Sequence, residues 1–473
     1  MNATQTHPTA RATTSLPRGR IRRPALLVGL ALTFLLGLAP AVLPAQAKPP
    51  PPTASSTAVM DWGEAAGRAA VAACLAPENN PLHEVRMYAM SHLAIHDALN
   101  SLDRRAESYA STFRAEPGAN PDAAVAAAAR ATLVSVIAEI PEPFAGCRGA
   151  ATDVVEDYYV DRLAMIPEGK AKQRGLAAGQ RAAEAVIAAR VGDGTDTPLI
   201  VADYPQGTAP GEWRFTAGTG FAFAPGWGEV TPFAITSADQ FRTASAAELD
   251  SGRYTRDFAE VKALGGDGVT TPTARTAEQT EIALFWVESS PMMWNKIARE
   301  LARSHDLDTW EQARLLGQLN AALFDGYVAS FDKKYDESFW RPETAIQLAA
   351  DDGNRRTTPD PTWTPLRTTP PIPDHDSAHA VEGGAAAGVM RSFFGTPRLS
   401  FSVCSETLPD RSCSSADPKL RSFDSITEAA HENAYSRVLV GFHFRHASEI
   451  GNRHGLRIGQ WTASSILQPV RHR

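Results

Sequence analysis

The chain has 473 residues, of which 43% are hydrophobic and 21% charged, and its formal net charge is -7 at pH 7. This composition excludes a collagen-like, a fully disordered or a multi-span membrane protein, and it leaves enough apolar material for a sizeable core. The acidic balance excludes a generally basic nucleic-acid binder, so any positively charged site must be a local concentration of Lys and Arg.

The first 47 residues have the features of a secretory signal. Five Arg precede an apolar run from about Ala25 to Leu43, four of them between Arg18 and Arg23, and the tripeptide Ala45-Gln46-Ala47 follows. A basic region, a hydrophobic stretch and an A-x-A ending are typical of a signal peptide and predict cleavage after Ala47. A retained membrane anchor is the alternative, which the Pro residues at the end of the apolar run disfavour. We therefore expect a secreted protein with no stable membrane insertion.

The four cysteines fit an exported protein, because disulfides persist outside the cytoplasm. Four Cys allow three pairings. Cys404 with Cys413 would close a short local loop, and Cys74 would then pair with Cys147. Four unpaired buried thiols are the alternative.

Helical periodicity dominates the remainder of the chain. After a Pro-rich spacer over residues 48–57, we expect a single helical domain over residues 58–473. Asp122 is a suitable N-cap for the third expected helix. The segments that we predict to be helical, from apolar spacing or Ala-rich composition, are 58–73, 82–102, 122–140, 171–191, 277–329, 379–394 and 425–455.

Two stretches interrupt this pattern. Residues 191–276 are rich in Gly, Pro and Thr, and we interpret them as long loops held by the side chains of Trp213 and Trp227. Residues 351–376 are rich in Pro and Thr. No strand-like alternation persists, so the predicted fold class is all-α with long irregular loops.

Histidines are concentrated near the end of the chain, where seven of the twelve lie between His375 and His472. Two basic residues precede this region. Lys334 and Arg341 are seven apart, which on a helix places them two turns apart on nearly one face. Two cations on one face could bind an anion at a partly dry site. A solvated helix face is the alternative.

The second segment is Ser377-Ala378-His379, which we expect at the start of a helix of very small residues. Asp376 or Ser377 is a natural N-cap, and the first turn leaves backbone N–H groups and the positive end of the helix dipole free to hold an anion. Ser377 can add a hydroxyl donor, and His379 can exchange a proton. An ordinary capped helix with a surface His is the alternative.

The third segment contains Arg437, Gly441 and His443. Arg437 offers a planar fork for oxyanions. His443 lies six residues on, about 120° around an ideal helix, so Arg437 would have to bend inward to share its pocket. Gly441 allows a neighbouring element to approach closely. A buried structural His is the alternative.

Together, Lys334…Arg341-Pro342, Ser377-Ala378-His379 and Ser436-Arg437…Gly441-Phe442-His443 resemble the vanadium-dependent haloperoxidase and type-2 phosphatidic acid phosphatase superfamily in both spacing and order. The resemblance implies an all-α helical bundle of the vanadium haloperoxidase or acid phosphatase type, with an oxyanion site within residues 331–447. It also implies vanadate as the cofactor. The expected reactants are then hydrogen peroxide, a halide and a small organic acceptor.

The resemblance assigns a role to each matching residue. His443 would be the axial vanadium ligand, and His379 would be the acid–base group that assists peroxide. Further donors to the oxyanion oxygens would be Lys334, Arg341, Arg437, the Ser377 hydroxyl and the Ala378 backbone N–H. The halide pocket would include Phe331 and Ile372.

The sequence departs from the pattern at Asp376, Ala378 and Ala447. Asp376 adds a negative charge that could weaken oxyanion binding or orient a neighbouring group, and Ala378 adds a methyl group beside the anion. Ala447 stands where phosphatase members carry the Asp that orients the nucleophilic His. The loss argues mildly against phosphatase activity, because a nucleophile needs its orienting partner more than a metal ligand does.

Three other functions compete with halide oxidation. A phosphatase of the same superfamily would hydrolyse a phosphate ester through a phosphohistidine at His443, and a non-catalytic oxyanion binder would use the same residues without turnover. A zinc enzyme could be argued from His92, His96 and Asp97, but the Glu of H-E-x-x-H is absent. We interpret these His as buried core residues.

Overall fold

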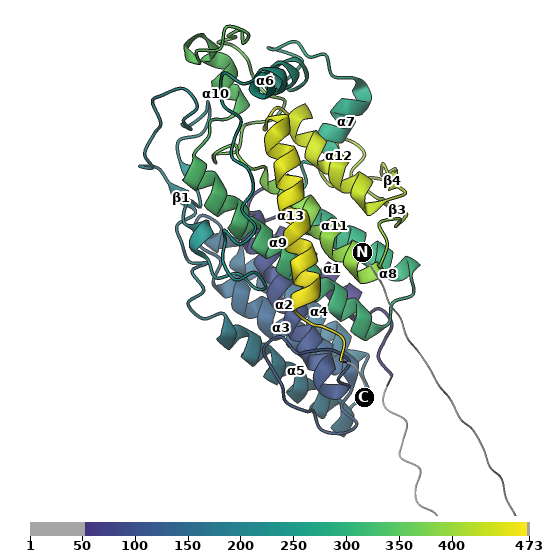
Figure 1. Ribbon diagram of the computed structural model, residues 1–473. Coiled ribbons are helices and arrows are strands. Elements are labelled where there is room, and N and C mark those ends of the chain that lie inside the picture. The colour runs from purple at the N-terminus through teal and green to yellow at the C-terminus, as the bar shows by residue number, and fades with distance from the viewer. Residues whose placement is uncertain (1–52, 471–473) are drawn as a thin grey trace, which may run out of the picture. The chain divides into compact units, whose positions relative to one another are not determined.

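Residues 53–470 of the chain are described by the computed structural model (Figure 1). They consist of helices joined by loops, with two short strand pairs, as the all-α prediction requires. The predicted signal peptide and residues 48–52 of the Pro-rich spacer lie outside the described residues.

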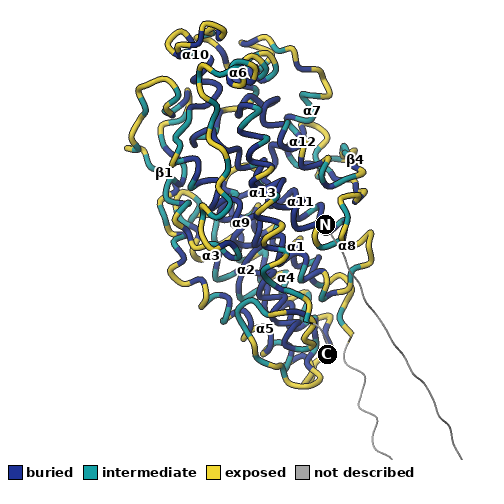
Figure 2. The backbone as a smooth tube through the Cα atoms, in the orientation of Figure 1, coloured by how far each residue is buried: buried dark blue, intermediate teal, exposed yellow. Residues whose placement is uncertain are grey.

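The described part of the chain begins with a group of five helices. Their bounds are α1 (Ala58–Ala72), α2 (Pro81–Leu102), α3 (Pro121–Ala138), α4 (Arg148–Ala164) and α5 (Lys170–Ala189). Nearly every residue of α2 is buried, since α3 and α5 pack on it within this group and α9 packs on it from the second half of the chain. Figure 2 shows α2, α9 and α11 as the buried interior.

Two details of this group differ from the sequence-based expectation. The N-cap of α3 is Asn120, whose side chain accepts a hydrogen bond from Ala123 N at 2.9 Å, and Asp122 instead accepts one from Ser55 N at 2.8 Å. Helix α4 was not predicted, because only Ala151 and Val155 of its seventeen residues are buried. A helix that lies on the surface with so small an apolar face leaves no periodic signal.

The Gly-rich belt is mostly loop, as predicted, and the indoles of Trp213 and Trp227 are fully buried in it. It also contains the antiparallel pair β1 (Ile200–Val201) and β2 (Ala222–Phe223) and the unpredicted helix α6 (Gly252–Leu264). The side chain of Ser251 caps α6 by accepting from Tyr254 N.

The second half of the chain contributes the helices that surround the predicted site. The bounds are α7 (Ala277–Phe285), α8 (Ser290–Ser304), α9 (Thr309–Glu337), α10 (Pro342–Gln347), α11 (Ala378–Phe394), α12 (Ile426–Leu439) and α13 (Arg445–Ser465). A second antiparallel pair, β3 (Phe401–Val403) with β4 (Arg421–Phe423), lies beside α12. Three 3-10 turns, η1 (Ala145–Cys147), η2 (Trp227–Glu229) and η3 (Ala349–Asp351), complete the elements.

Two breaks between helices differ from the sequence-based expectation. Ser338 adopts a left-handed conformation that terminates α9, so Lys334 and Arg341 do not share a helix as predicted. Likewise the predicted helix over 425–455 is two helices, α12 and α13. Gly441 interrupts them at φ +87°, where a Cβ would lie 2.6 Å from the carbonyl oxygen of Gly265, so His443 lies in the connecting turn and not on the helix of Arg437.

Helix α11 is the centre of this half and contacts α8, α9, α12 and α13. Its crossing with α13 is a backbone-to-backbone contact. A Cβ on Gly455 would lie 1.8 Å from the carbonyl oxygen of Val381, and one on Gly384 would lie 2.1 Å from that of Asn452. The small residues that predicted a helix here therefore also fix how closely it packs.

The four cysteines form the pairs that the sequence favoured, Cys74–Cys147 and Cys404–Cys413. Among the described residues, α3 is long and apolar enough to cross a membrane, but two thirds of it is buried inside the protein. That burial is the property of a core helix.

Candidate active site

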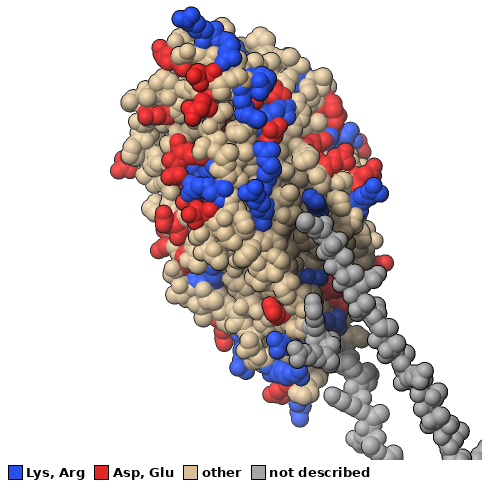
Figure 3. Space-filling view, in the orientation of Figure 1, with Lys and Arg blue, Asp and Glu red and all other residues tan. Residues whose placement is uncertain are grey.

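The three predicted segments converge on one buried centre. Lys334 comes from the last turn of α9, and Arg341 is the residue before α10. Ser377 precedes α11, Arg437 lies in the last turn of α12, and His443 lies in the turn before α13. All five are buried. Charges of both signs are mixed on the face that Figure 3 shows, so this concentration of positive charge is internal and not a surface patch.

The His443 imidazole is held at both ring nitrogens. Its Nδ1 lies 2.9 Å from Asp374 Oδ1, and its Nε2 lies 2.9 Å from Arg341 Nη1. A carboxylate is an acceptor, so Nδ1 carries the proton and Nε2 presents its lone pair to Arg341. Burial and the charges of Arg341, Lys334 and Arg437 lower the pKa of His443 well below its ordinary value. The imidazole is therefore neutral, which is the form that binds a metal or attacks phosphorus.

Asp374 is the functional residue that sequence reasoning missed. It supplies the carboxylate that we judged absent when Ala447 replaced the family Asp, so the argument against phosphatase activity was wrong on this point. Burial raises the pKa of Asp374 to about 7 against the opposing charges of Arg341 and Lys334. The available signal was its place in the string Pro373-Asp374-His375, directly before the second motif.

Arg341 is fixed by backbone acceptors. Its Nε donates to Ile372 O at 2.6 Å and its Nη1 to Phe442 O at 2.8 Å, while Nη2 has no partner in the protein. Lys334 is fixed similarly, since its Nζ donates to Pro373 O at 2.8 Å and to Asp374 O at 3.0 Å.

Arg437 and Ser377 also retain unused hydrogen-bonding groups. Arg437 Nη1 donates to Trp286 O at 2.8 Å, and its Nε has no partner. Burial and the charge of Arg341 lower the pKa of Arg437 to about 9. Ser377 occupies the N-cap position, but its hydroxyl makes no capping bond and is also unpartnered. Buried donors without acceptors are costly. Arg341 Nη2, Arg437 Nε and the Ser377 hydroxyl therefore fit a bound oxyanion that accepts hydrogen bonds from them.

His379 lies in the first turn of α11, as predicted, and is partly buried. Its Nε2 is 3.3 Å from Glu288 O. Burial and the charge of Arg437 lower its pKa well below the ordinary value, so this imidazole is neutral and can accept a proton.

The carboxylate of Asp376 makes its hydrogen bonds with residues other than the oxyanion donors. It accepts from Ser330 Oγ at 2.9 Å and lies 2.8 Å from His454 Nδ1. Burial alone would raise the pKa of Asp376, but the charge and hydrogen bond of His454 lower it to about 2. Of the two effects that we considered for Asp376, orienting a neighbour is therefore the one that its contacts match.

The two residues of the predicted halide pocket lie differently. Ile372 contributes its carbonyl to Arg341, as described above. Phe331 is buried among aromatic rings. Its ring centroid lies 6.4 Å from that of Phe223 and 6.3 Å from those of Tyr327 and Tyr335.

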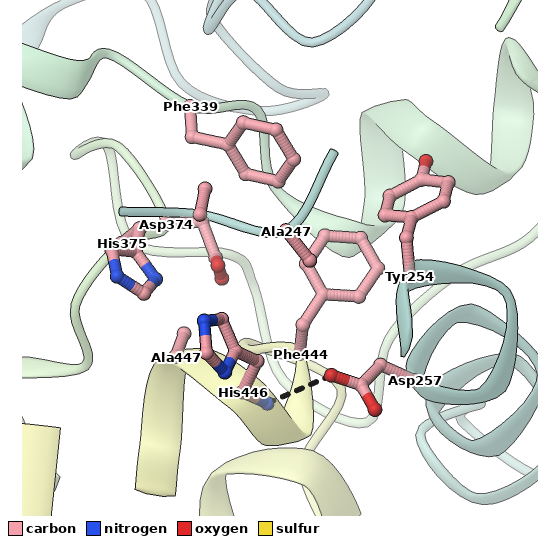
Figure 4. Close-up of a pocket in the computed structure, with 10 residues that line it drawn as sticks. Ala247, Tyr254, Asp257, Phe339, Asp374, His375, Phe444, His446 and Ala447 are labelled. Carbon is pink, nitrogen blue, oxygen red and sulfur yellow. Dashed lines mark hydrogen bonds between the residues drawn. The ribbon is translucent and has the colours of Figure 1, made fainter. Parts of the chain in front are cut away.

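A cavity of about 10 Å³, the size of a single water molecule, lies on the Asp374 side of the site (Figure 4). Asp374 and the imidazoles of His375 and His446 line it, and the two imidazoles stack with ring centroids 5.4 Å apart. His375 and His446 therefore lie beside the carboxylate that orients His443.

The residues of the zinc alternative are separately satisfied. His92 Nδ1 lies 2.9 Å from Tyr88 O, and Asp97 accepts hydrogen bonds from three backbone N–H groups, those of Tyr109, Ala110 and Ser111. No group of three or more potential metal ligands occurs within residues 53–470.

Comparison with known proteins agrees with this geometry. Residues 314–472, which include every residue of the candidate site, match the family described as the VCPO second helical-bundle domain. This match supports the vanadium haloperoxidase superfamily for the part of the chain that carries the candidate site. Vanadium chloroperoxidase of Curvularia inaequalis is 25% identical over 280 residues, which cover 47% of this chain and 45% of that protein. The chain thus spans less than half the length of this curated superfamily member in the match.

Two solved structures of the superfamily share the fold. The first bacterial vanadium-dependent iodoperoxidase superposes with a TM-score of 0.70 at 23% identity, covering 89% of this chain and 99% of that one. The holo-type bacterial vanadium-dependent chloroperoxidase gives 0.63 at 16% identity, covering 80% and 90%. These likenesses extend the fold assignment to the part of the chain before residue 314, which the family match does not reach.

Proposed function

We propose that this chain is a vanadate-dependent haloperoxidase that uses hydrogen peroxide to oxidise a halide to a hypohalous species, which then halogenates a small organic acceptor. The observation that carries the proposal is the buried neutral His443, whose Nε2 lone pair faces a ring of cations with unpartnered donors. The relatives named above are vanadium haloperoxidases, which supports the same reaction class.

The residues present fit vanadate. His443 Nε2 would bind vanadium, and Arg341, Arg437, Lys334 and the Ser377 hydroxyl would hold its oxygens. One cation about 4 Å from an anionic oxygen contributes roughly 4 kcal/mol at an effective dielectric of about 20, so several such contacts offset the acidic net charge of the chain. Bound vanadate supplies Lewis acidity to peroxide without a redox change of its own.

The chain's own residues then prepare the reactants. Asp374 accepts a hydrogen bond from the Nδ1–H of His443, which keeps Nε2 free of a proton and orients the ring. His379 would accept a proton from incoming peroxide. Its lowered pKa leaves one ring nitrogen unprotonated at neutral pH and therefore free to do so. The burial of Arg341 and Lys334 excludes water from the anion and strengthens each charge contact.

A phosphatase is the second candidate, and the Asp374–His443 pair specifically favours it. In that reaction His443 Nε2 would attack phosphorus while Asp374 orients the ring, and His379 would protonate the leaving oxygen. The same anion donors serve both reactions, because phosphate and vanadate have the same shape and charge type.

One experiment separates the two activities. Purified chain lacking residues 1–47 is stripped of metal, loaded with vanadate, and assayed with peroxide, bromide and a phenolic dye, beside a phosphate monoester without vanadate. We expect bromination of the dye that depends on vanadate, peroxide and halide together. Ester hydrolysis that vanadate inhibits, without any bromination, would establish the phosphatase instead. Anion binding without either reaction would leave a non-catalytic binder.

We also propose that the protein is secreted after cleavage behind Ala47. The two disulfides support this, because such bonds persist outside the reducing cytoplasm. Mass spectrometry of protein collected from the culture medium should give Lys48 as the first residue.

A further inference from the structure

Two side chains of the candidate site bind carbonyl groups of one short segment, the linker between α7 and α8. Arg437 Nη1 donates to Trp286 O at 2.8 Å, and His379 Nε2 lies 3.3 Å from Glu288 O. One guanidinium and one imidazole of the oxyanion site are thus oriented by the same few residues of backbone.

The far side of this linker is held by a loop that the Cys404–Cys413 disulfide closes. Ser405 Oγ donates to Phe285 O at 2.8 Å, and Thr407 Oγ1 donates to Leu284 O at 2.8 Å. Both hydroxyls lie within the ten-residue loop. The loop therefore binds the end of α7 at the point where the linker begins.

Glu288 joins the loop to the site. Its carbonyl faces His379, while its buried carboxylate accepts from the backbone N of Glu406 at 2.9 Å. The Lys296 ammonium pairs with this carboxylate, at 2.6 Å from Oε1, and donates to Cys404 O at 3.0 Å. A buried carboxylate needs such partners, so loss of the loop's contacts would leave the Glu288 charge poorly satisfied and free the linker to move.

Besides the disulfide, the loop is closed by a hydrogen bond from Cys413 N to Ser405 O at 3.1 Å and by one from Ser414 Oγ to Glu406 Oε2 at 3.0 Å. Strand β3 ends at Val403, directly before the first cysteine, and β4 begins only at Arg421, eight residues after Cys413. Without the sulfur–sulfur bond, residues 404–420 would form one long connection with many more conformations.

We propose that the Cys404–Cys413 loop is a positioning element for Arg437 and His379, so that oxyanion binding depends on this disulfide. The inference rests on the oxyanion site of the proposed function. Reduction by a dithiol breaks the sulfur–sulfur bond, gives two cysteine thiols and converts the dithiol to its own disulfide. The linker then loses its clamp and the two site residues lose their fixed acceptors.

The test compares the two disulfides of the same protein. In chain lacking residues 1–47, Cys404→Ser with Cys413→Ser is compared with Cys74→Ser with Cys147→Ser, whose cysteines lie at the end of α1 and in η1. Calorimetry gives the dissociation constants of inorganic phosphate and of vanadate. We expect at least fivefold weaker binding without the Cys404–Cys413 bond and a change within twofold without the other, although both variants melt at a lower temperature.

A second pair of variants keeps the disulfide and guards against unfolding. Thr407→Val removes the hydroxyl that binds Leu284 O, and Thr407→Ser retains it. We expect Thr407→Val to weaken phosphate binding two- to fivefold and to speed hydrogen exchange of residues 284–288, and Thr407→Ser to restore both. Neither substitution alters a residue of the oxyanion site.

The outcomes are distinct from those of the activity assay. Unchanged phosphate and vanadate affinity in the Cys404/Cys413 variant, or an equal loss in both disulfide variants, overturns the positioning role even if the wild-type chain oxidises halide. A wild-type chain that binds the anions without oxidising halide contradicts only the proposed function. Failure of the wild-type chain to bind either anion overturns both.

Discussion

His443 takes its chemical character from Asp374, which accepts from Nδ1, and from Arg341, which donates to Nε2. Each neighbour acts on a different nitrogen: the carboxylate fixes the tautomer, and the guanidinium occupies the lone pair that an oxyanion centre would use. In Asp374→Asn the amide could present its NH2 group to Nδ1 and favour the other tautomer.

We expect Asp374→Asn to weaken vanadate binding by about 10- to 100-fold, the range found when the outer partner of a ligating His is lost. Titration of the metal-free variant with vanadate, followed by vanadium NMR, measures the affinity. Nitrogen NMR of the imidazole provides an independent check, because the proton should move from Nδ1 to Nε2. An unchanged tautomer together with unchanged affinity would contradict the role of Asp374.

The two histidines of the site should fail in different ways. His443→Ala removes the ligand, so the variant should bind vanadate only as weakly as the Lys and Arg side chains of the site hold an anion by charge. His379→Ala should leave vanadate affinity within about threefold and lower the rate with peroxide by about 100-fold or more, the usual contribution of a positioned acid–base group. Equilibrium binding and steady-state rates on both variants check this. Retention of binding and halide oxidation by His443→Ala would disprove the ligand assignment.

At the scale of elements, the site depends on how closely α11 and α13 cross. Gly455→Ala would place a methyl group 1.8 Å from the carbonyl oxygen of Val381, which cannot be relieved without separating the helices. We expect a loss of stability of about 3 kcal/mol or more, as for other overpacked interiors. Gly149→Ala on α4, where a Cβ meets nothing within 4 Å, is the control and should be neutral or stabilising by up to about 1 kcal/mol. Urea unfolding of both variants gives the comparison, and equal midpoints would rule out the close crossing.

Sequence periodicity predicted the elements that bury a continuous apolar or small-residue face, such as α2, α3 and α11. It missed α4, whose polar surface hides the period, and it joined α12 to α13, because a single Gly441 at positive φ ends a helix without changing the composition around it. The family resemblance of the three motifs pointed to residues that the structure brings together around His443, but not to Asp374. It could not place Lys334 and Arg341 on separate elements, since that depends on the left-handed turn at Ser338.

The partner of His443 shows a second limit of sequence reasoning. The family position for a carboxylate holds Ala447, and the group that replaces it comes from a segment 69 residues from His443 along the chain. Only the packing of the α11 start against the α12–α13 turn brings Asp374 to the ring. A tertiary contact of this kind leaves no pattern in one sequence, although two Asp beside a motif His were visible candidates.

For the molecule as a whole, buried acids set the dependence of stability on pH. Glu84 in α2 is fully buried, and burial raises its pKa from 4.5 to about 8. Between these values the unfolded chain has released the proton that the folded chain retains, so the free energy of unfolding falls as pH rises. The full effect of this group is roughly 5 kcal/mol.

Glu84→Gln keeps the shape and removes the proton. We expect the free energy of unfolding to fall less in the variant than in the wild type between pH 5 and pH 8. The difference between the two free energies should therefore shrink or change sign near pH 8. Urea unfolding at several pH values gives the two slopes. Parallel slopes would show that Glu84 titrates normally. Glu84 is not one of the oxyanion donors, but its carboxyl lies beside Ser289 and Glu288 of the linker between α7 and α8, so anion binding is measured on the same variant.

The ring of Lys334, Arg341 and Arg437 has a further consequence for which ions can reach His443. A neutral imidazole is ordinarily an excellent ligand for zinc, copper or nickel dications. Here the charges of Arg341, Lys334 and Arg437 act on His443, so such a dication would meet like charge and would gain only one nitrogen. The centre therefore disfavours any metal cation because of its positive charge. Contaminating transition metals, including those shed by a chelating resin, should leave the site accessible to an oxyanion.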